Sequence, residues 1–126
     1  MQVIKRVRAT PEALELIHSL EKEFGPLMFH QSGGCCDGSS PMCFAKGDFI
    51  IGQSDVGIAH IENTEFWMSK DQFEYWRHTC LTLDVVKGCG SSFSIEIPSG
   101  NRFIIRSSMY SEEELKNLEP LFFKQD

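Results

Sequence analysis

The sequence lacks the features that mark several large classes of protein. It has no apolar run near the ~18 residues that a membrane-spanning helix needs, and basic side chains interrupt residues 1–8, which a secretory signal does not tolerate. Lys and Arg number only 12 against 18 Asp and Glu, so the net charge is −6 at pH 7. Domains that bind nucleic acid or anionic lipid usually carry a basic excess. We therefore expect no nucleic acid and no membrane as partners.

The sequence also lacks the cysteine pattern of a secreted disulfide scaffold. There are five cysteines, an odd number, and Cys35 and Cys36 are adjacent. Scaffolds of that kind usually carry an even set with loop-spanning spacings. No internal repeat, low-complexity stretch or linker divides the chain, and 126 residues correspond to one domain. We expect residues 1–126 to form a single cytoplasmic domain with reduced thiols.

The clearest element in the sequence is a helix over residues 11–24. Thr10 suits the N-cap, Pro11 suits the first helical position, and the Gly25-Pro26 pair ends the helix. The apolar residues recur at helical spacing and predict one buried face, made of Ala13, Leu16, Ile17, Leu20 and Phe24.

The residue pattern of the rest of the chain predicts short strands and turns with two short helices. Helices are expected at 70–78, capped by Ser69, and at 112–118, capped by Ser111. A cysteine-bearing loop is expected over 31–47. The expected strands are 2–8 (an edge strand), 27–30, 48–52, 56–62, 65–68, 80–86, 93–97 and 102–106. Consecutive strands joined by hairpin-sized loops predict the α+β class, with a mostly antiparallel sheet or sandwich-like arrangement.

Residues 30–43 form the most unusual segment of the sequence. Three thiols and one imidazole lie within fourteen residues, on a chain rich in glycine. Thiolate and imidazole are the ligands that select zinc, iron or copper(I) over magnesium and calcium. We therefore predict a transition-metal site, iron or zinc, with copper as a further option because Met42 adds a thioether. Its candidate ligands are His30, Cys35, Cys36 and Cys43.

Two other interpretations of this segment stay open. Its spacing is not that of a zinc finger, because two of the cysteines are adjacent. In a metal-free site, Cys35 or Cys36 can act as a nucleophile with His30 as base, and Cys36 and Cys43 can pair reversibly. In the simplest interpretation, the cysteines are small buried side chains without chemistry.

Two further places carry weaker signals. In a strand, His60 and Glu62 lie on one face and can supply imidazole and carboxylate to an iron centre. A solvated face of a sheet produces the same alternation without function. His78, at the end of the short middle helix, either points into a pocket or caps the helix end.

Several stretches of the sequence together resemble one family. The run 31–43 is similar to the signature of domain-of-unknown-function family 779, a set of small bacterial proteins, and so are residues 73–79, 83–86 and 93–96. In that family the positions of Cys80 and Cys89 are usually Gln and Arg, so the resemblance leaves both out of the site.

The resemblance also implies a metabolic setting. Members of the family are associated with genes for aldehyde dehydrogenases, which implies a role in aldehyde or alcohol oxidation. The protein would then be an accessory protein or a small metal-dependent enzyme. The alternatives are a metal-free thiol module that binds aldehydes or senses oxidation, and an interaction partner of an aldehyde dehydrogenase. A homodimer formed through an open sheet edge is a further expectation.

Overall fold

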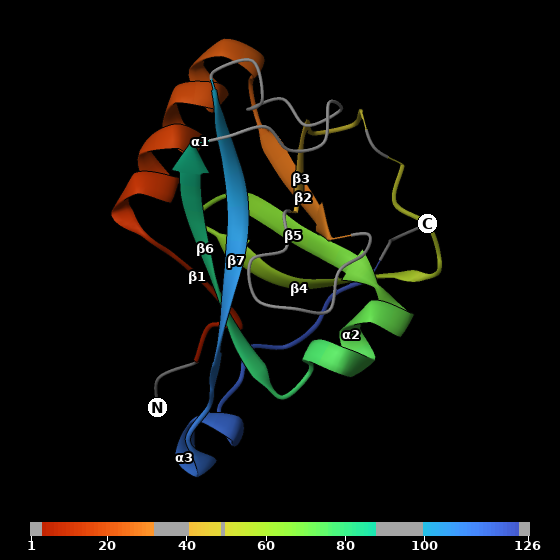
Figure 1. Cartoon of the computed structure of the whole chain (residues 1–126). Coiled ribbons are helices and arrows are strands. Elements are labelled where there is room, and N and C mark those ends of the chain that lie inside the picture. The colour runs from red at the N-terminus through yellow and green to blue at the C-terminus, as the bar shows by residue number, and fades with distance from the viewer. Residues whose placement is uncertain (1–3, 32–40, 49, 88–99, 124–126) are drawn as a thin grey trace.

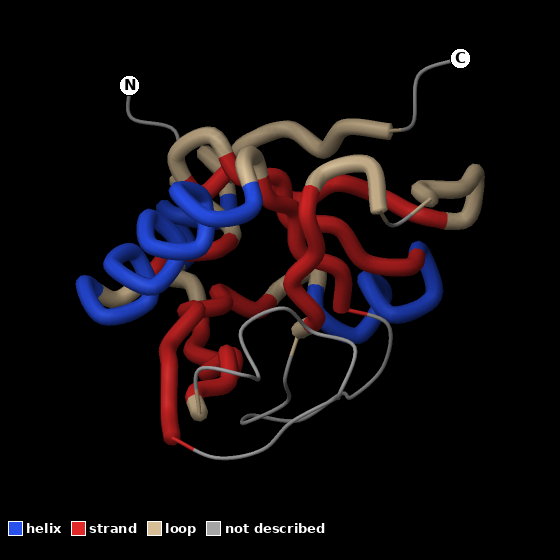
Figure 2. The backbone as a smooth tube through the Cα atoms, turned by 90° about the horizontal axis from the view of Figure 1, so that it is seen from above, coloured by secondary structure: helices blue, strands red, loops and turns tan. Residues whose placement is uncertain are grey.

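The described part of this computed structural model comprises residues 4–31, 41–48, 50–87 and 100–123. These residues form three helices and seven strands, and the strands make two sheets that run crosswise to each other (Figure 1). The helices α1 (Pro11–Phe24) and α2 (Lys70–Trp76) lie on opposite sides of the strands (Figure 2). The predicted α+β class is confirmed.

The first sheet has three strands in the order β1-β6-β7. Strands β6 (Thr79–Lys87) and β7 (Asn101–Met109) pair antiparallel along their whole length. The short strand β1 (Val7–Ala9) pairs parallel with β6 and lies at the sheet edge, as the sequence predicted, although the expected strand began earlier. Leu81 and Leu83 face the core from this sheet, as the alternation of apolar residues over 80–86 indicates.

The second sheet has four strands in the order β3-β2-β5-β4. Its members are β2 (Leu27–Gln31), β3 (Met42–Ala45), β4 (Asp55–Ile61) and β5 (Thr64–Ser69). The β2–β3 and β4–β5 pairs are antiparallel, but β2 and β5 are parallel. Both sheets are therefore mixed. The parallel pairings join strands far apart in sequence, which local patterns do not reveal.

Helix α1 forms as predicted. The Thr10 hydroxyl oxygen accepts a hydrogen bond from the Ala13 N–H at 3.1 Å, and Gly25 ends the helix at φ 82°. Ala13, Ile17 and Leu20 are buried. Phe24 does not join them: it is the last helical residue, and its side chain is 43% exposed where the chain turns away.

Two predictions between β2 and β4 were wrong. The expected loop 31–47 contains strand β3, because Met42–Ala45 pairs along β2. The expected strand 48–52 is absent among the described residues of that range. A turn follows β3 instead, with Gly47 at φ 100° and the Asp48 N–H donating to the Ala45 carbonyl at 2.9 Å. The expected strand 93–97 lies outside the described residues.

The two capped helices form where they were expected but are shorter. Helix α2 ends at Trp76, with the Ser69 hydroxyl oxygen accepting from the Gln72 N–H at 3.1 Å. Helix α3 (Glu112–Leu115) begins with the complete Ser111–Glu114 capping box. Among the described residues, no helix has the length and apolar character needed to cross a membrane.

A single core lies between the two sheets. Phe29 of β2 stacks on Phe66 of β5, at 5.8 Å between ring centroids. It also meets Phe103 of β7 edge to face at 4.9 Å, so one ring joins both sheets. Helix α1 covers the core with Ala13, Ile17 and Leu20, and α2 contributes Phe73 and Trp76.

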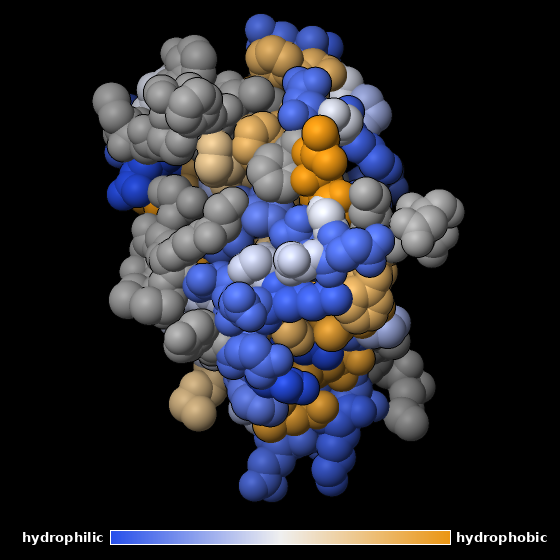
Figure 3. Space-filling view, turned by 90° about the vertical axis from the view of Figure 1, so that its right-hand side faces the viewer, coloured by the Kyte–Doolittle hydropathy of each residue, from blue (hydrophilic) through white to orange (hydrophobic). Residues whose placement is uncertain are grey.

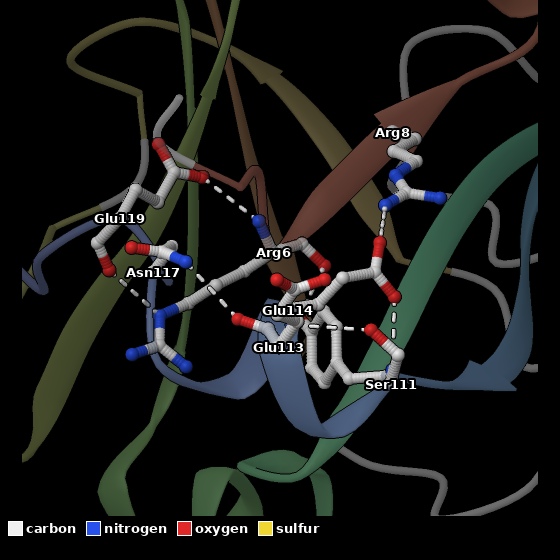
Figure 4. A network of polar contacts seen from close by, with 8 residues as sticks. Arg6, Arg8, Ser111, Glu113, Glu114, Asn117 and Glu119 are labelled. Atoms are coloured by element: carbon white, nitrogen blue, oxygen red, sulfur yellow. Dashed lines mark hydrogen bonds and ion pairs between the residues drawn. The ribbon is translucent and has the colours of Figure 1, made fainter. Parts of the chain in front are cut away.

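The segment after α3 ties the N-terminal part of the chain to the second sheet. The Arg6 N–H donates to Glu119 Oε1 and the Arg6 Nε donates to the Glu119 carbonyl, both at 3.0 Å (Figure 4). Further along, Phe122 exchanges two backbone hydrogen bonds with Gly57 of β4, at 2.7 and 2.9 Å. The C-terminal segment therefore reaches the sheet that carries His30.

Candidate functional site

His30 lies on the face of the second sheet that points away from the core. Its neighbour Phe29 is in the core, and successive side chains of a strand point to opposite faces. His30 is nevertheless 4% exposed, and it is one of the few buried polar residues among those described. A buried imidazole must keep its polar atoms hydrogen-bonded to avoid a desolvation penalty.

The partner of His30 is Asp55, at the start of β4. His30 Nε2 lies 2.8 Å from Asp55 Oδ1, and the two side chains are only 5% and 13% exposed. The other carboxylate oxygen, Oδ2, accepts the Gly52 N–H at 2.8 Å. Both oxygens of Asp55 are therefore held, and the carboxylate fixes the orientation of the imidazole.

The orientation of this pair has a chemical consequence. When a neutral imidazole donates Nε2–H to a carboxylate, its lone pair is on Nδ1. Nδ1 is then the atom that can ligate a metal or accept a proton. The His30–Asp55 pair is thus built like the carboxylate–histidine unit that commonly supports a metal ligand.

Cys43 does not share this face. It lies directly opposite Phe29 in the β2–β3 register, is fully buried, and belongs to the core. His30 is paired instead with Met42. The register therefore separates His30 and Cys43 by the thickness of the sheet, and it places the Met42 thioether beside His30.

The same face carries an aromatic cover. Trp67 of β5 is the other register neighbour of His30, and its Nε1–H donates to Glu65 Oε1 at 3.1 Å. The Phe122 ring meets Trp67 edge to face at 5.0 Å and rests on Gly57. A Cβ at Gly57 would lie 2.0 Å from that ring, so this close approach requires glycine.

The weaker candidates from the sequence, His60, Glu62 and His78, lie apart from the His30–Asp55 pair. His60 is exposed and stacks on the Phe122 ring at 4.5 Å. Strand β4 ends at Ile61, and Glu62 turns to φ 56° and pairs with His18 of α1. The predicted common strand face of His60 and Glu62 therefore does not form. His78 is exposed and lines a separate cavity with Arg6 and Phe73.

The remaining cysteines divide into two kinds. Cys35, Cys36 and Cys89 lie outside the described residues. Cys80 is 2% exposed, although it lies on the face of β6 opposite Leu81 and Leu83. Within the described ranges, no three His, Cys, Asp or Glu side chains are grouped closely enough to hold a metal ion.

Sequence reasoning missed Asp55. It follows His30 by 25 residues and precedes an apolar strand, where a single aspartate indicates only a turn. No local pattern connects it to the imidazole, because β5 and β4 bring it there through tertiary pairing.

Comparison with known proteins gives a family and no function. No curated protein and no solved structure matches the chain. The family model described as a domain of unknown function, DUF779, matches residues 16–109, which include the cysteine segment and both members of the His30–Asp55 pair. Because this match covers well over half of the chain, the protein belongs to the DUF779 family.

Proposed function

We propose that this protein binds a transition metal, iron, zinc or copper, with His30 as its imidazole ligand. The observation that carries the proposal is the buried His30–Asp55 pair. Ligating histidines almost always donate their second ring N–H to a carboxylate, a backbone carbonyl or water, which fixes the tautomer and raises ligand basicity. Here the carboxylate is itself fixed by the Gly52 N–H.

The sequence supplies the other proposed ligands. Cys35 and Cys36 follow His30 by five and six residues. We leave Cys43 out of the proposed set because it lies with Phe29 on the core face, so the proposal has three protein ligands. Catalytic zinc sites also use three protein ligands and keep a fourth position for water or substrate.

The proposal includes a role in aldehyde or alcohol oxidation, with which an open metal position is compatible. A bound metal with an open position supplies Lewis-acid polarisation of a carbonyl oxygen. His30 would hold such an ion, and Asp55 would keep the imidazole oriented. The proposal also includes an accessory role, in which the protein acts together with an aldehyde dehydrogenase and does not itself convert the substrate.

The same pair supports a second candidate, a metal-free thiol module. A carboxylate that orients an imidazole is also the arrangement that makes histidine a general base toward a nucleophile. In that case Nδ1 of His30 accepts the proton of Cys35 or Cys36, the thiolate adds to the carbonyl carbon of an aldehyde, and the resulting alkoxide takes the proton back from His30 to give a hemithioacetal. No metal is required.

Elemental analysis of the untagged full chain, purified without oxygen, tests the proposal. We expect near-stoichiometric iron, zinc or copper, and its loss in His30→Gln and Cys35→Ser. Asp55→Asn should weaken metal affinity by about 10- to 100-fold, measured by competition with a chromophoric chelator. The matched control is His18→Gln, which breaks an exposed imidazole–carboxylate pair and should retain the metal.

Two results would count against metal binding at His30. One is metal that persists unchanged in His30→Gln and Cys35→Ser. The other is a metal-free protein that takes up no metal on reconstitution and titrates five thiols. In the second case, rapid alkylation by iodoacetamide that slows in His30→Gln would favour the thiol candidate.

A further inference from the structure

A cavity separate from the His30–Asp55 pair lies beside the end of α2. On the side of the molecule that carries α2, apolar side chains show between hydrophilic ones (Figure 3). The volume of the cavity is about 210 Å³, and it forms between the end of α2, the segment before β1 and the C-terminal segment. It shares no lining residue with the His30–Asp55 pair. The lining residues are Arg6, Phe73, Arg77, His78, Leu115, Leu118 and Leu121.

The ionisable side chains that line this cavity are all basic. They are Arg6, Arg77 and His78, in a chain whose net charge is −6. Burial lowers the pKa of Arg6, and the neighbouring Arg77 acts in the same direction, against the opposite influence of Tyr110 and Glu119. Basic side chains are thus gathered in one cavity of a protein whose overall net charge is negative.

The Arg6 guanidinium has no ion-pair partner among the described residues. Its Nε donates to the Glu119 backbone carbonyl, whereas the Glu119 carboxylate accepts the Arg6 backbone N–H (Figure 4). Within the described part of the chain Arg77 pairs with Glu74 alone, at 3.3 Å between exposed side chains, and such pairs contribute little. An anion in the cavity would therefore meet two guanidinium groups that it can neutralise.

The remaining walls are apolar. The Arg6 guanidinium carbon lies over the Phe73 ring, 5.6 Å from the ring centroid, so Phe73 supports the guanidinium group. The three leucines come from α3 and the segment after it. A site lined by both cationic groups and leucines matches a ligand with an anionic head and an apolar body.

We propose that this cavity binds a small organic carboxylate with an apolar tail. The planar fork of Arg6 takes the carboxylate, which it matches with two parallel hydrogen bonds. Arg77 and the His78 ring N–H supply further donors, and the tail lies against Leu115, Leu118 and Leu121. The volume is below the ~300–1,000 Å³ of pockets for drug-sized ligands, so the acid is small.

Titration of the full chain with hexanoate tests this proposal, with binding followed by amide chemical shifts in NMR. The matched probes are 1-hexanol, which has the tail without the charge, and acetate and inorganic phosphate, which have charge without the tail. We expect saturable binding of hexanoate and at least tenfold weaker binding of each other probe. The shifted amides should cluster around Phe73, Arg77 and Leu118.

Variants separate the proposed site from binding elsewhere. Arg6→Met should weaken hexanoate binding by about 10- to 100-fold, because a charge-assisted hydrogen-bond pair is lost. Arg77→Gln changes an exposed residue, keeps the fold, and should weaken binding severalfold. Arg106→Gln is the control, since Arg106 pairs with Asp84 away from the cavity and should bind hexanoate like the wild type.

Three outcomes would overturn the proposal. The first is hexanoate binding no tighter than 1-hexanol, which removes the role of charge. The second is equal binding of phosphate, which removes the role of the tail. The third is unchanged hexanoate affinity in Arg77→Gln together with shifted amides away from α2. The metal proposal is unaffected by any of them, because no residue is shared.

Discussion

Two imidazole–carboxylate pairs in this protein differ mainly in their burial. His30 Nε2 lies 2.8 Å from Asp55 Oδ1, with side chains 5% and 13% exposed. His18 Nε2 also meets a carboxylate oxygen, that of Glu62, but those side chains are 52% and 51% exposed. Among the residues that the structure describes, the same chemical pair therefore occurs both inside the molecule and on its surface.

The difference shows what burial adds to a polar pair. An exposed ion pair exchanges its partners with water and is screened by salt, so it contributes about 0–1 kcal/mol. A buried pair has no such exchange, and loss of one partner leaves the other desolvated. Only the buried pair is held in one orientation, as a metal ligand or a general base requires.

The largest expected effect comes from removing one imidazole at a time. His30→Ala should lower the free energy of unfolding by about 3 kcal/mol, because Asp55 then stays buried without its partner. His18→Ala should lower it by less than about 1 kcal/mol. Urea unfolding of the metal-free protein, followed by tryptophan fluorescence, measures both. Equal losses would show that burial does not distinguish the pairs.

A smaller effect is expected from disturbing the cover of the buried face. Gly57→Ala places a methyl group where the Phe122 ring lies, and should destabilise the protein by about 1–3 kcal/mol. Its control is Gly52→Ala, whose Cβ would meet its nearest atom, Asp55 Oδ2, at 3.7 Å, an ordinary contact. Amide exchange at Gly57 and Phe122 should accelerate in the first variant alone. Intact exchange protection there would contradict the proposed clash.

Replacing both members of the buried pair should matter less than replacing one. The double variant His30→Leu/Asp55→Leu removes both buried polar groups together, although it also takes the acceptor from the Gly52 N–H. We therefore expect it to lose less free energy of unfolding than the ~3 kcal/mol of His30→Ala. Its metal content should nevertheless be lost. A double variant as unstable as His30→Ala would mean that the pair contributes to stability itself.

The smallest effect is the response to salt. At 1 M ionic strength the Debye length is about 3 Å, so the stability difference between wild type and His18→Ala should shrink. The corresponding difference for His30→Ala should persist, because solvent ions do not reach a buried pair. Urea unfolding at low and high sodium chloride gives both differences. If high salt reduced the two stability differences equally, the His30–Asp55 pair would have to be in contact with solvent.

Local features of the fold were predictable because neighbouring residues decide them. Thr10, Pro11 and Gly25 set the ends of α1 through hydrogen bonds and backbone preferences within a single turn. Ser111 and Glu114 likewise form their capping box within four residues. The alternation over 80–86 placed Leu81 and Leu83 on the core side, although Cys80 on the opposite face is buried too.

The candidate site was predictable only in part. His30 was named from its place beside the cysteines, but Asp55 was not, since 25 residues separate the two. Cys43 was counted as a ligand with His30, whereas strand register puts it on the core side. Register depends on which strands pair, and a shift of one residue moves a side chain to the other face.

The sequence by itself determined the elements with local signals: α1 and its caps, the starts of α2 and α3, and the faces of β6. It also marked His30 and the cysteine segment as the place to look for chemistry. Only the tertiary structure decided that β2 lies beside β5, that Asp55 holds His30, and that Phe122 covers Gly57. These contacts join residues distant along the chain, and they form only when the burial of a common core brings those residues together.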